Sequence, residues 1–496
     1  MSISQNSARG VKLGVITAVL VAAEAVAILE TTMSTQLLYA PEGFFDVSVA
    51  SLTWILTAYT LAAAISAAIA ARLGDIFGRR NVLAGVLFLS AFGSLISAFA
   101  PEFWILIAGR ALQGVSGAAL PLAIGYISAI YPRERVGTAV TVVSSSAVIA
   151  GAFGVLLGGV ILSALDWHAI YWITAIAAAA CAALVYYLLP NEAKETLVTG
   201  RRIDVLGAVL FGVGIASVLF ATTNSVGVGL FSPMVLIPGI SGLVLLVIFV
   251  LWELKITSPL FDLAILKIRN VRNAMIMSVF LGFGPLGMYQ ALSPRLHRQP
   301  AEVGDVVVGV GLGMHPVTFG IVTGVAATLA FLLSGVIGRL SDRYGAWFIL
   351  VLGCGLATIG LTMNLVGPSS VFFVVGGMTI FTISSACLMS GIPSLIVQTV
   401  DSSIASVTAA MAQNIRNVFQ SVGTAVLGVL LSIGAVTVGN ESLVSYSGLM
   451  AGATAIIVAA FIVVLLALRS KRSVVEPDQT VTEVAMSSPD HAQSRS

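Results

Sequence analysis

Three charged residues, Glu24, Glu30 and Arg110, lie deep inside long apolar stretches of the sequence. A charged side chain at the centre of a bilayer costs about 3 kcal/mol or more, unless it is paired or solvated or a carboxyl group takes up a proton. Burial favours the neutral form of Glu30, whereas a nearby arginine would favour its charged form. Because these influences oppose each other, a change of conformation could load or release a proton at Glu30. We therefore predict that Glu30 and Arg110 take part in proton coupling.

The same residues also allow structural interpretations. Glu30 could be a permanently neutral carboxyl group, and Arg110 could only cap backbone carbonyls. Glu24 precedes Glu30 by six residues, which places the two side chains about 120° apart around a helix. Glu24 could be a second proton site, a carboxylate that recognises a cation, or a hydrogen-bond partner between helices. We include it with the proton-coupling residues.

The composition is that of an integral membrane protein. Of the 496 residues, 58% are hydrophobic and 9% are charged, and the mean hydropathy is +1.03; soluble domains carry about 25% charged residues. The cysteines and histidines are scattered without the spacing of a disulfide framework or a metal site. The sequence also lacks a nucleophile–base set and a Gly-x4-Gly-Lys-Ser/Thr phosphate loop. It therefore argues against an enzyme, against a metal or cofactor, and against ATP as the energy source.

The predicted fold class is an all-α membrane protein with fourteen spans. A helix needs about 20 mainly apolar residues to cross a bilayer, and membrane β-strands are shorter and alternate in polarity. The expected spans cover residues 13–39, 48–72, 81–100, 103–131, 136–164, 168–189, 203–223, 232–254, 272–293, 314–338, 346–366, 370–398, 404–436 and 445–468.

Lys and Arg concentrate in the segments on one side of these spans. With the N-terminus inside, twenty of them fall on the cytoplasmic side and only Arg295 and Arg298 fall outside. Positive charge marks the cytoplasmic side of a membrane protein. We therefore expect a multi-pass protein of the plasma (cell inner) membrane with both termini in the cytoplasm.

A short charged phrase occurs twice, at residues 72–80 and 338–345, with Asp75 and Asp342 at equivalent places 267 positions apart. Such a repeat indicates two related halves, as in transporters that rock about a central site. We expect an N-terminal six-helix bundle (1–190), a linker with two extra spans (191–270), a C-terminal six-helix bundle (271–469) and a disordered cytoplasmic tail (470–496). The external segment 294–313 is expected to be an ordered loop or a short helix.

Several short motifs occur in the order known from one family. They are Leu29-Glu30-Thr31-Thr32, Trp54-Ile55-Leu56-Thr57-Ala58-Tyr59, the first charged phrase, Arg110-Ala111-Leu112-Gln113-Gly114, Gly154-Val155-Leu156-Leu157-Gly158-Gly159, Ile203-Asp204-Val205-Leu206-Gly207 and Pro259-Leu260-Phe261. On these residues the chain resembles the fourteen-helix drug:proton antiporters of the major facilitator superfamily over nearly its full length. Ala71, Ile76 and Val155 depart from the family pattern. The stretch between the ninth and tenth spans looks most like actinobacterial members.

The resemblance implies that the first and fourth spans line a central cavity. Glu30 and Arg110 would then communicate directly, through Gln113 or through water. Polar residues within one late span could line the cavity or make contacts between the bundles, and incidental packing is the alternative. The substrate-cavity residues that we predict are Glu30, Gln113, Gln413, Asn417 and Gln420, and the predicted helix-packing motif is Gly154, Gly158 and Gly159.

The two charged phrases are predicted to form a conformational gate. An aspartate can accept hydrogen bonds at a helix N-terminus and gain from the helix dipole, and would thereby hold the two bundles together while the outside is open. The predicted gate residues are Asp75, Gly78, Arg79, Arg80, Asp342 and Arg343. We expect Arg79 and Arg80 to pair with acids such as Glu134 or with lipid headgroups. Simple anchoring by positive charge is the alternative.

The function that we predict is proton-coupled export of lipophilic or cationic small molecules by alternating access. The expected partners are the lipid bilayer, protons and a small-molecule substrate, without nucleic acid, and the protein is expected to be a monomer that uses the proton gradient in place of a cofactor. An exporter dedicated to one endogenous lipid, siderophore or metabolite is an alternative. A membrane sensor or scaffold that transports nothing is an alternative of another class.

Overall fold

The computed structural model describes residues 13–39, 45, 47, 49–52, 54–192, 204–228, 232–256, 263–303, 306–402, 404–431, 433, 436–438 and 441–475. Several positions of the sequence analysis lie outside these residues. They are Ile203, Pro259 to Phe261, the tail from residue 476 onward and, among the Lys and Arg counted above on the cytoplasmic side, Arg9, Lys12, Lys194, Arg201 and Arg202.

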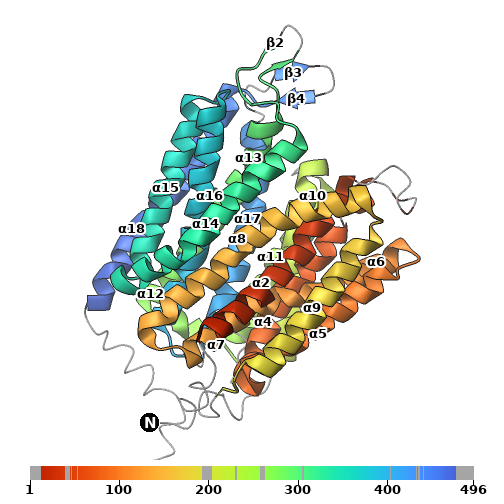
Figure 1. Ribbon diagram of the computed structural model, residues 1–496. Coiled ribbons are helices and arrows are strands. Elements are labelled where there is room, and N and C mark those ends of the chain that lie inside the picture. Colours follow the sequence, from red (N-terminus) through yellow and green to blue (C-terminus); the bar gives the residue numbers. More distant parts are fainter. Residues whose placement is uncertain are drawn as a thin grey trace, which may run out of the picture.

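The first six predicted spans correspond to a bundle of long helices (Figure 1). Its helices are α2 (Leu13–Ser34, continued by the 3-10 turn η1, Thr35–Tyr39), α4 (Trp54–Phe77), α5 (Arg79–Ala98), α6 (Phe103–Gln113), α7 (Ala119–Ile130), α8 (Arg133–Ala164) and α9 (His168–Leu188), with the short helix α3 (Val49–Leu52) before α4. A 3-10 turn, η3 (Gly114–Ala118), joins α6 to α7 within one span. We call these helices the N-terminal bundle.

A second bundle repeats this arrangement in the C-terminal half of the chain. Its helices are α12 (Arg269–Leu281), α13 (Tyr289–Arg298), α14 (Pro316–Tyr344), α15 (Ala346–Val366), α16 (Val371–Thr399), α17 (Ala405–Leu431) and α18 (Tyr446–Val475). A π-helical turn, η6 (Gly282–Met288), joins α12 to α13, and the 3-10 turn η5 (Leu263–Lys267) precedes α12. We call these helices the C-terminal bundle. Two further helices, α10 (Val205–Val228) and α11 (Pro233–Glu253), come between the bundles in sequence.

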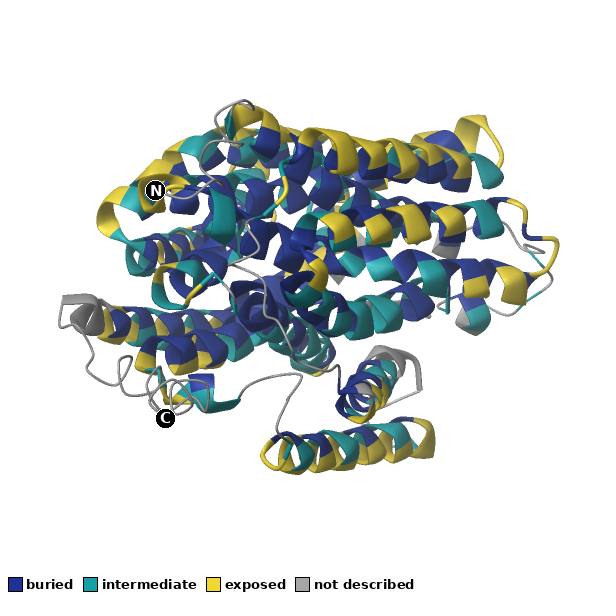
Figure 2. Ribbon diagram, turned by 90° about the horizontal axis from the view of Figure 1, so that it is seen from below, coloured by how far each residue is buried: buried dark blue, intermediate teal, exposed yellow. Residues whose placement is uncertain are grey.

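Twelve helical segments of the described residues are long and apolar enough to cross a membrane. Helices α10 and α17 are not among the twelve, although they have 24 and 27 residues. Helix α17 carries Gln413, Asn414, Arg416, Asn417 and Gln420, which lower its hydropathy. The structure is therefore all helical across the membrane, and the count of fourteen spans stays a prediction. Exposed positions lie on the outer faces of the helices (yellow in Figure 2). Many of them are large apolar residues, as lipid contact requires.

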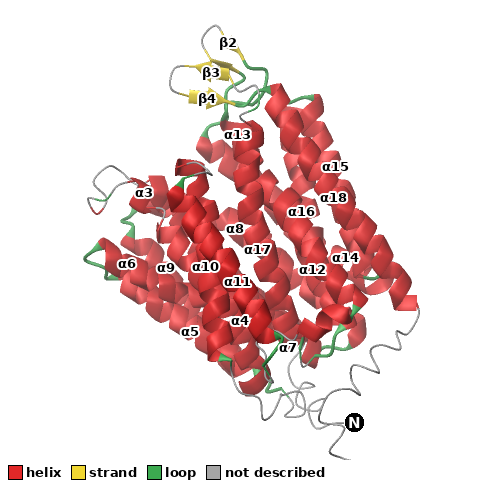
Figure 3. Ribbon diagram, turned by 180° about the vertical axis from the view of Figure 1, so that it is seen from behind, coloured by secondary structure: helices red, strands yellow, loops and turns green. Residues whose placement is uncertain are grey.

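Two ends of the molecule serve as reference points (Figures 1 and 3). Two small antiparallel hairpins, β1 (Glu302–Val303) with β2 (Val306–Val307) and β3 (Val436–Val438) with β4 (Glu441–Leu443), lie at one end of the C-terminal bundle. We call this end the hairpin side. The segment 294–313, predicted to be a loop or a short helix, instead contains the end of α13 and the first hairpin. The opposite end carries the turns at Gly78 and Gly345 and is called the turn side.

The charged phrases form tighter turns than the sequence suggested. The predicted spans 48–72 and 314–338 end before Asp75 and Asp342, but both aspartates belong to the last turns of helices, since α4 extends to Phe77 and α14 to Tyr344. Each turn consists of a single glycine, Gly78 with φ of 91° and Gly345 with φ of 88°. Such positive φ angles are open to glycine and strained for other residues. The two aspartates are therefore held by regular helix, which fixes their direction.

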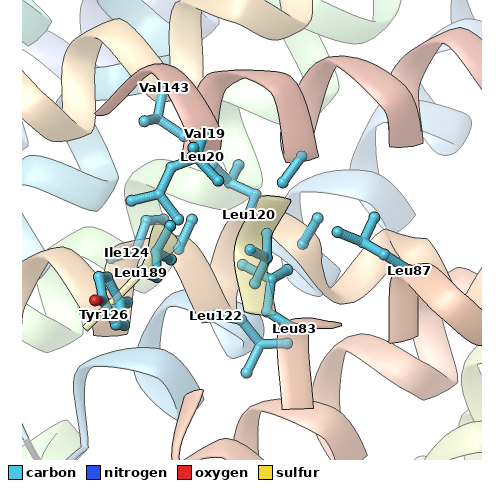
Figure 4. Close-up of a cluster of buried hydrophobic side chains, with 14 of the residues drawn as sticks. Val19, Leu20, Leu83, Leu87, Leu120, Leu122, Ile124, Tyr126, Val143 and Leu189 are labelled. Carbon is cyan, nitrogen blue, oxygen red and sulfur yellow. The ribbon is translucent and has the colours of Figure 1, made fainter. Parts of the chain in front are cut away.

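The bundles meet along two seams. Along one seam α8 packs against α14, and Gly338 lies so close to α8 that an added Cβ would be 2.6 Å from Cα of Thr138. Along the other seam α4 packs against α17. In the core of the N-terminal bundle, α2, α5, α7 and α8 contribute one packed apolar cluster, whose labelled members include Leu20, Leu83, Leu120, Ile124 and Val143 (Figure 4). These packed helices carry the charged and polar side chains described below.

Candidate functional site: a buried carboxylate and two interbundle contacts

Glu30 of α2 is fully buried, and both of its carboxylate oxygens accept hydrogen bonds. Ser90 of α5 donates its hydroxyl to Oε1 at 2.6 Å, and Ser116 of η3 donates to Oε2 at 2.7 Å. Both serine hydroxyls also lie within hydrogen-bond distance of the backbone carbonyl of Gln113, at 3.2 and 2.9 Å. Tyr59 completes this group, with its hydroxyl 3.0 Å from that of Ser116. The carboxylate is thus solvated by hydroxyl groups from two other spans.

Arg110 of α6 is also fully buried and lies next to this network. Its Nη1 donates to the backbone carbonyl of Glu30 at 3.1 Å and to Oε1 of Gln113 at 2.7 Å, and its Nε donates to the carbonyl of Ile55 at 2.9 Å. The guanidinium lies 4.7 Å from the ring centroid of Tyr59, at cation–π distance. Arg110 therefore caps carbonyls and binds Gln113 at the same time.

The structure refines the predicted connection between Glu30 and Arg110. Among the described residues, no ion pair joins the Glu30 carboxylate to the Arg110 guanidinium. Their connection runs through Gln113, whose backbone carbonyl meets the two serines and whose side chain holds Arg110. Gln113 Nε2 in turn donates to the hydroxyl of Ser94. Ser90, Ser94 and Ser116 were missed in the sequence analysis. The signal for the first two was their spacing of four residues within an apolar span, which places them on one helix face.

Glu24, the third predicted coupling residue, lies on the same helix as Glu30 but outside its hydrogen-bond network. It is buried in α2, with 5% of its surface exposed, and interacts electrostatically with Arg416 of α17 in the other bundle. Arg416 is itself 7% exposed. The sequence alone does not identify this neighbour of Glu24, because 392 positions separate the two residues.

The first gate contact centres on Arg79, which is fully buried at the turn side. Within its own bundle, Arg79 Nη2 lies 2.7 Å from Oδ1 of Asp75, and Nη1 lies 2.9 Å from Oε1 of Glu192. Across the seam, Nε donates to the hydroxyl of Ser406 at 2.7 Å, and Nη2 donates to the carbonyl of Ser402. Ser406 is the second residue of α17. We call this set of contacts the Arg79 latch.

Arg79 pairs with acids, as expected, but these are Asp75 and Glu192, and Glu134 is a partner of neither Arg79 nor Arg80. Arg79 binds Glu192 instead, and Arg80 donates to the side chain of Asn191 and to the carbonyl of Tyr186, both within the N-terminal bundle. Glu192 and Asn191 follow the end of α9, which brings them to the start of α5. Glu134 lies at the start of α8, beside the other seam.

The second gate contact lies at the same end of the molecule but along the other seam. Asp342 of α14 accepts hydrogen bonds through Oδ2 from the backbone N–H of Thr138, at 3.0 Å, and from its hydroxyl. Thr138 belongs to the first two turns of α8. We call this the Asp342 latch. Arg343, also predicted for the gate, is exposed and lies 5.3 Å from the ring of Tyr344, so its position gives it no bond across the seam.

The glycines of α8 differ in how closely they approach α2. A Cβ added at Gly154 would lie 1.9 Å from the hydroxyl oxygen of Thr32, and one at Gly158 would lie 2.5 Å from the carbonyl oxygen of Met33. At Gly159 the nearest atom would be 3.8 Å away, which is ordinary contact. Gly154 and Gly158 therefore allow close helix packing, whereas Gly159 does not require it. Val155, in place of the family's proline, is 41% exposed on the outer face.

A cavity of about 340 Å³ lies between α8 and the C-terminal bundle. It is lined by α8, η6, α13, α14, α16 and α17, and the rings of Tyr289 and Phe381 stack in its wall with centroids 3.4 Å apart. Phe319, Gln290 and Gln420 also line it, and none of its lining residues is charged. Of the predicted cavity residues, Gln420 lines this space and Gln413 lines a separate small cavity. Glu30, Gln113 and Asn417 line neither, and hydrogen bonds to other helices occupy Glu30 and Gln113.

These features define a class of protein. Two related helical bundles face each other across a buried boundary, with ionisable residues inside the membrane region, as in a secondary transporter. The family model described as Major Facilitator Superfamily matches residues 14–424. The chain belongs to the major facilitator superfamily, a family of transporters and not of enzymes.

Curated relatives point to efflux proteins within this family. The multidrug resistance protein B homolog of Mycobacterium tuberculosis is 27% identical over 400 residues, covering 78% of this chain and 70% of that protein. The lincomycin resistance protein LmrB of Listeria monocytogenes is 29% identical over 335 residues, covering 67% of this chain and 68% of that protein. Because relatives come from both mycobacteria and Listeria, an actinobacterial relationship stays a prediction.

Solved structures share the fold at low sequence identity. The human organic anion transporter MFSD10 (TETRAN) is 13% identical with a TM-score of 0.62, covering 90% of this chain and 99% of that chain. The proton:xylose symporter XylE is 14% identical with a TM-score of 0.60, covering 92% of this chain and 94% of that chain. At these identities the likeness concerns the fold alone.

Proposed function

We propose that the chain is a proton-coupled exporter of lipophilic or cationic small molecules that works by alternating access. The observation that supports it best is the hydrogen-bonding arrangement at Glu30. As a carboxylate, Glu30 only accepts hydrogen bonds, and it receives them from Ser90 and Ser116. When Glu30 is protonated, it becomes a donor to one of these hydroxyl oxygens, and that serine then needs another acceptor.

The backbone carbonyl of Gln113 can be that acceptor, because it lies 3.2 Å from the Ser90 hydroxyl and 2.9 Å from the Ser116 hydroxyl. Either state of Glu30 can therefore be satisfied without leaving a buried polar atom unpaired. Since Gln113 also binds Arg110, the protonation state of Glu30 can alter the position of Arg110. This is the behaviour of a proton site, and a permanently neutral carboxyl group would not need it.

The two latches support alternating access. Both connect the bundles at the turn side, and the uncharged cavity lies between the middle of α8 and the C-terminal bundle, farther from that side than the latches. In our proposal the turn side faces the cytoplasm, both termini are cytoplasmic, and the protein acts as a monomer in the plasma membrane. Helices α10 and α17 also cross the membrane in this proposal, which brings the number of spans to fourteen.

The lining of the cavity supports a lipophilic cargo. Aromatic and aliphatic side chains surround Gln290, Gln420 and a few hydroxyl groups, a composition typical of sites for apolar small molecules. The names of the relatives, multidrug resistance and lincomycin resistance, agree with drug export. A dedicated exporter of one endogenous lipophilic product is the second candidate. The uncharged lining supports this candidate as much as it supports drug export.

The test is transport by the purified protein in liposomes with an imposed pH gradient, against a panel of dyes, lipophilic cations and lipids. We expect flux that depends on the gradient, loss of that dependence in Glu30→Gln, and normal flux in Glu102→Gln, a matched change at an exposed carboxylate. Flux of one lipid class alone would support the dedicated exporter. No gradient-driven flux for any compound would contradict both proposals and favour a sensor or scaffold.

A further inference from the structure

Two glutamine side chains meet in the wall of the uncharged cavity of about 340 Å³. Gln290 is the second residue of α13, and Gln420 belongs to α17, a helix in contact with α13. Nε2 of Gln420 donates to Oε1 of Gln290 at 2.6 Å. Because both residues line the cavity, its wall contains a pair of joined amide groups.

This pair uses only part of its hydrogen-bonding capacity. An amide side chain offers two N–H donors and a carbonyl oxygen that accepts, so two amides can exchange a hydrogen bond in each direction. Here one direction is used. Among the described residues, Nε2 of Gln290 and Oε1 of Gln420 have no hydrogen-bond partner, and neither atom is buried. The pair therefore offers one free donor and one free acceptor.

The hydroxyl groups of the cavity offer mainly acceptors. Thr323, Thr382 and Ser385 donate their protons to backbone carbonyls four residues earlier in their own helices, at 2.8, 2.8 and 3.1 Å. The hydroxyl of Tyr289 is buried. Among the described side chains that line the cavity, the free donors are therefore those of Ser293 and of the glutamine pair.

Close backbone packing fixes the distance between the two glutamines. A Cβ added at Gly287 would lie 2.5 Å from the carbonyl oxygen of Gln420, and one added at Gly423 would lie 2.0 Å from that of Phe283. The hydroxyl of Thr424 also donates to the carbonyl of Gly287, at 3.1 Å. Helix α17 is thus held directly against η6, which continues into α13. A site that is arranged before its ligand arrives loses less free energy on binding.

We propose that the Gln290–Gln420 pair is a subsite that recognises a carboxamide group of the cargo. The N–H of the carboxamide donates to Oε1 of Gln420, and its carbonyl oxygen accepts from Nε2 of Gln290. The apolar remainder of the cargo packs against the stacked rings of Tyr289 and Phe381 in the same wall. The preferred cargo is therefore a lipophilic amide. This inference rests on the proposed function, which assigns the cargo to this cavity.

The test compares two fluorescent probes that differ in one group. Pyrenecarboxamide carries the carboxamide, and acetylpyrene has a methyl group in place of the amide nitrogen, so the ketone keeps the acceptor and loses the donor. Binding of each probe to the purified full chain in detergent is followed by fluorescence. The ratio of the two Kd values is compared between variants, because partitioning of a probe into detergent affects every variant equally.

We expect the wild type to bind the carboxamide about tenfold more tightly than the ketone, which is close to the contribution of one hydrogen bond. Gln420→Leu removes the acceptor for the N–H group, so this preference should disappear while acetylpyrene still binds. Binding of acetylpyrene also shows that the fold and the cavity are intact. Gln290→Leu removes the donor to the carbonyl group, and both probes should bind several-fold less tightly.

Thr379→Val is the control, since Thr379 lies in α16 outside the cavity wall and donates to the carbonyl of Val375; it should keep the wild-type preference. Equal affinity of the wild type for both probes would refute the subsite, as would an unchanged preference in Gln420→Leu. The proposed function would survive either result if a pH gradient still drove flux of both probes in liposomes. Without gradient-driven flux of any compound, the proposed function fails, and the subsite fails with it.

Discussion

Arg79 and Ser406, separated by 327 positions in sequence, meet through a hydrogen bond of 2.7 Å that crosses the boundary between the bundles. The same guanidinium reaches the carbonyl of Ser402 while it is held by Asp75 and Glu192. A planar group with five donors can serve acceptors on both sides of a boundary at once. The first charged phrase thus connects α4 and α5 to the start of α17.

Replacement of Arg79 by lysine should open the turn side. Lysine keeps the charge but cannot hold Asp75, Glu192 and Ser406 in one plane. We expect a cysteine introduced near Ser406 to react with a water-soluble thiol reagent about tenfold faster in this variant, in line with loss of charge-assisted hydrogen bonds worth about 1.5–3 kcal/mol. Arg80→Lys is the matched control, since Arg80 binds only groups of its own bundle. Equal reactivity in both variants would refute the Arg79 latch.

Loss of the Asp342 carboxylate should have the same consequence at the other seam. Asn at position 342 keeps one oxygen but loses the negative charge that strengthens both bonds from Thr138. We expect Asp342→Asn to slow gradient-driven flux about 5-fold or more, in line with a typical coupling energy between states, and Thr138→Val to act non-additively with it. Arg343→Gln should leave flux unchanged because Arg343 is exposed. Additive effects of the first two changes would show that the residues act separately.

The serines around Glu30 should be needed for coupling. In Ser116→Ala, the Oε2 atom of Glu30 loses its donor, and a protonated Glu30 loses one of its two acceptors. We expect gradient-driven flux to fall about tenfold, which corresponds to about 1.4 kcal/mol, while flux down a substrate gradient alone changes less. Ser146→Ala is a suitable control, because Ser146 is buried but bonds only within its own helix, to Val143. A coupled flux of wild-type size in Ser116→Ala would contradict the role of the serine.

Neighbouring glycines of α8 should respond differently to alanine. A methyl group at Gly158 meets the backbone of Met33 at 2.5 Å, whereas one at Gly159 finds its nearest atom at 3.8 Å. Backbone cannot move aside cheaply, so we expect Gly158→Ala to reduce the free energy of unfolding by about 1–3 kcal/mol and Gly159→Ala to change it little. Thermal unfolding in detergent measures both. The opposite order would show that α2 and α8 pack in another register.

The stacked pair Tyr289 and Phe381 should bind cargo. Phe381→Ala removes one of the two stacked rings in the cavity wall. We expect about tenfold weaker binding of a fluorescent lipophilic cation, which corresponds to a loss of about 1.4 kcal/mol in binding free energy. Phe372→Ala is the control, since Phe372 lies in the same helix but is 73% exposed. Similar losses in both variants would place the cargo elsewhere.

The helices could be predicted from sequence because a long apolar run in a bilayer has few alternatives to a helix, which satisfies all of its backbone hydrogen bonds internally. The burial of Glu24, Glu30 and Arg110 followed from the same argument. The hydrogen-bond partners of these residues could not be predicted, because hydrogen bonds between spans depend on the rotation of each helix about its axis. Gln113 illustrates this limit: its polarity suggested a place in the cavity, but the helix turns it toward Arg110 and Ser94.

The uncharged cavity, which we propose as the substrate site, was the least predictable part of the molecule. Its walls are formed by apolar and neutral residues, which are the common residues of every span, so no sequence signal distinguishes Phe381 from the exposed Phe372. Which aromatic residues face the cavity depends only on their position relative to α8. Pairing of Arg79 with Glu192 was missed for a similar reason, since Glu192 lies beyond the end of the sixth span, 113 positions away.

The hairpin of α10 and α11 makes the two seams unequal. Asp204 joins these helices through Trp252, whose Nε1 donates to its carboxylate at 2.9 Å. The inner face of the pair packs on Ala64 and Ala68 of α4 and on Val407 and Ala410 of α17, and Figure 2 shows the pair at the periphery. One seam is therefore covered from the bilayer by an added wall, while the cavity lies along the seam of α8 and α14. Among the described helices, α10 and α11 are the pair that shields a seam in this way, so lipid would reach the seam of α8 and α14 more directly than the seam of α4 and α17.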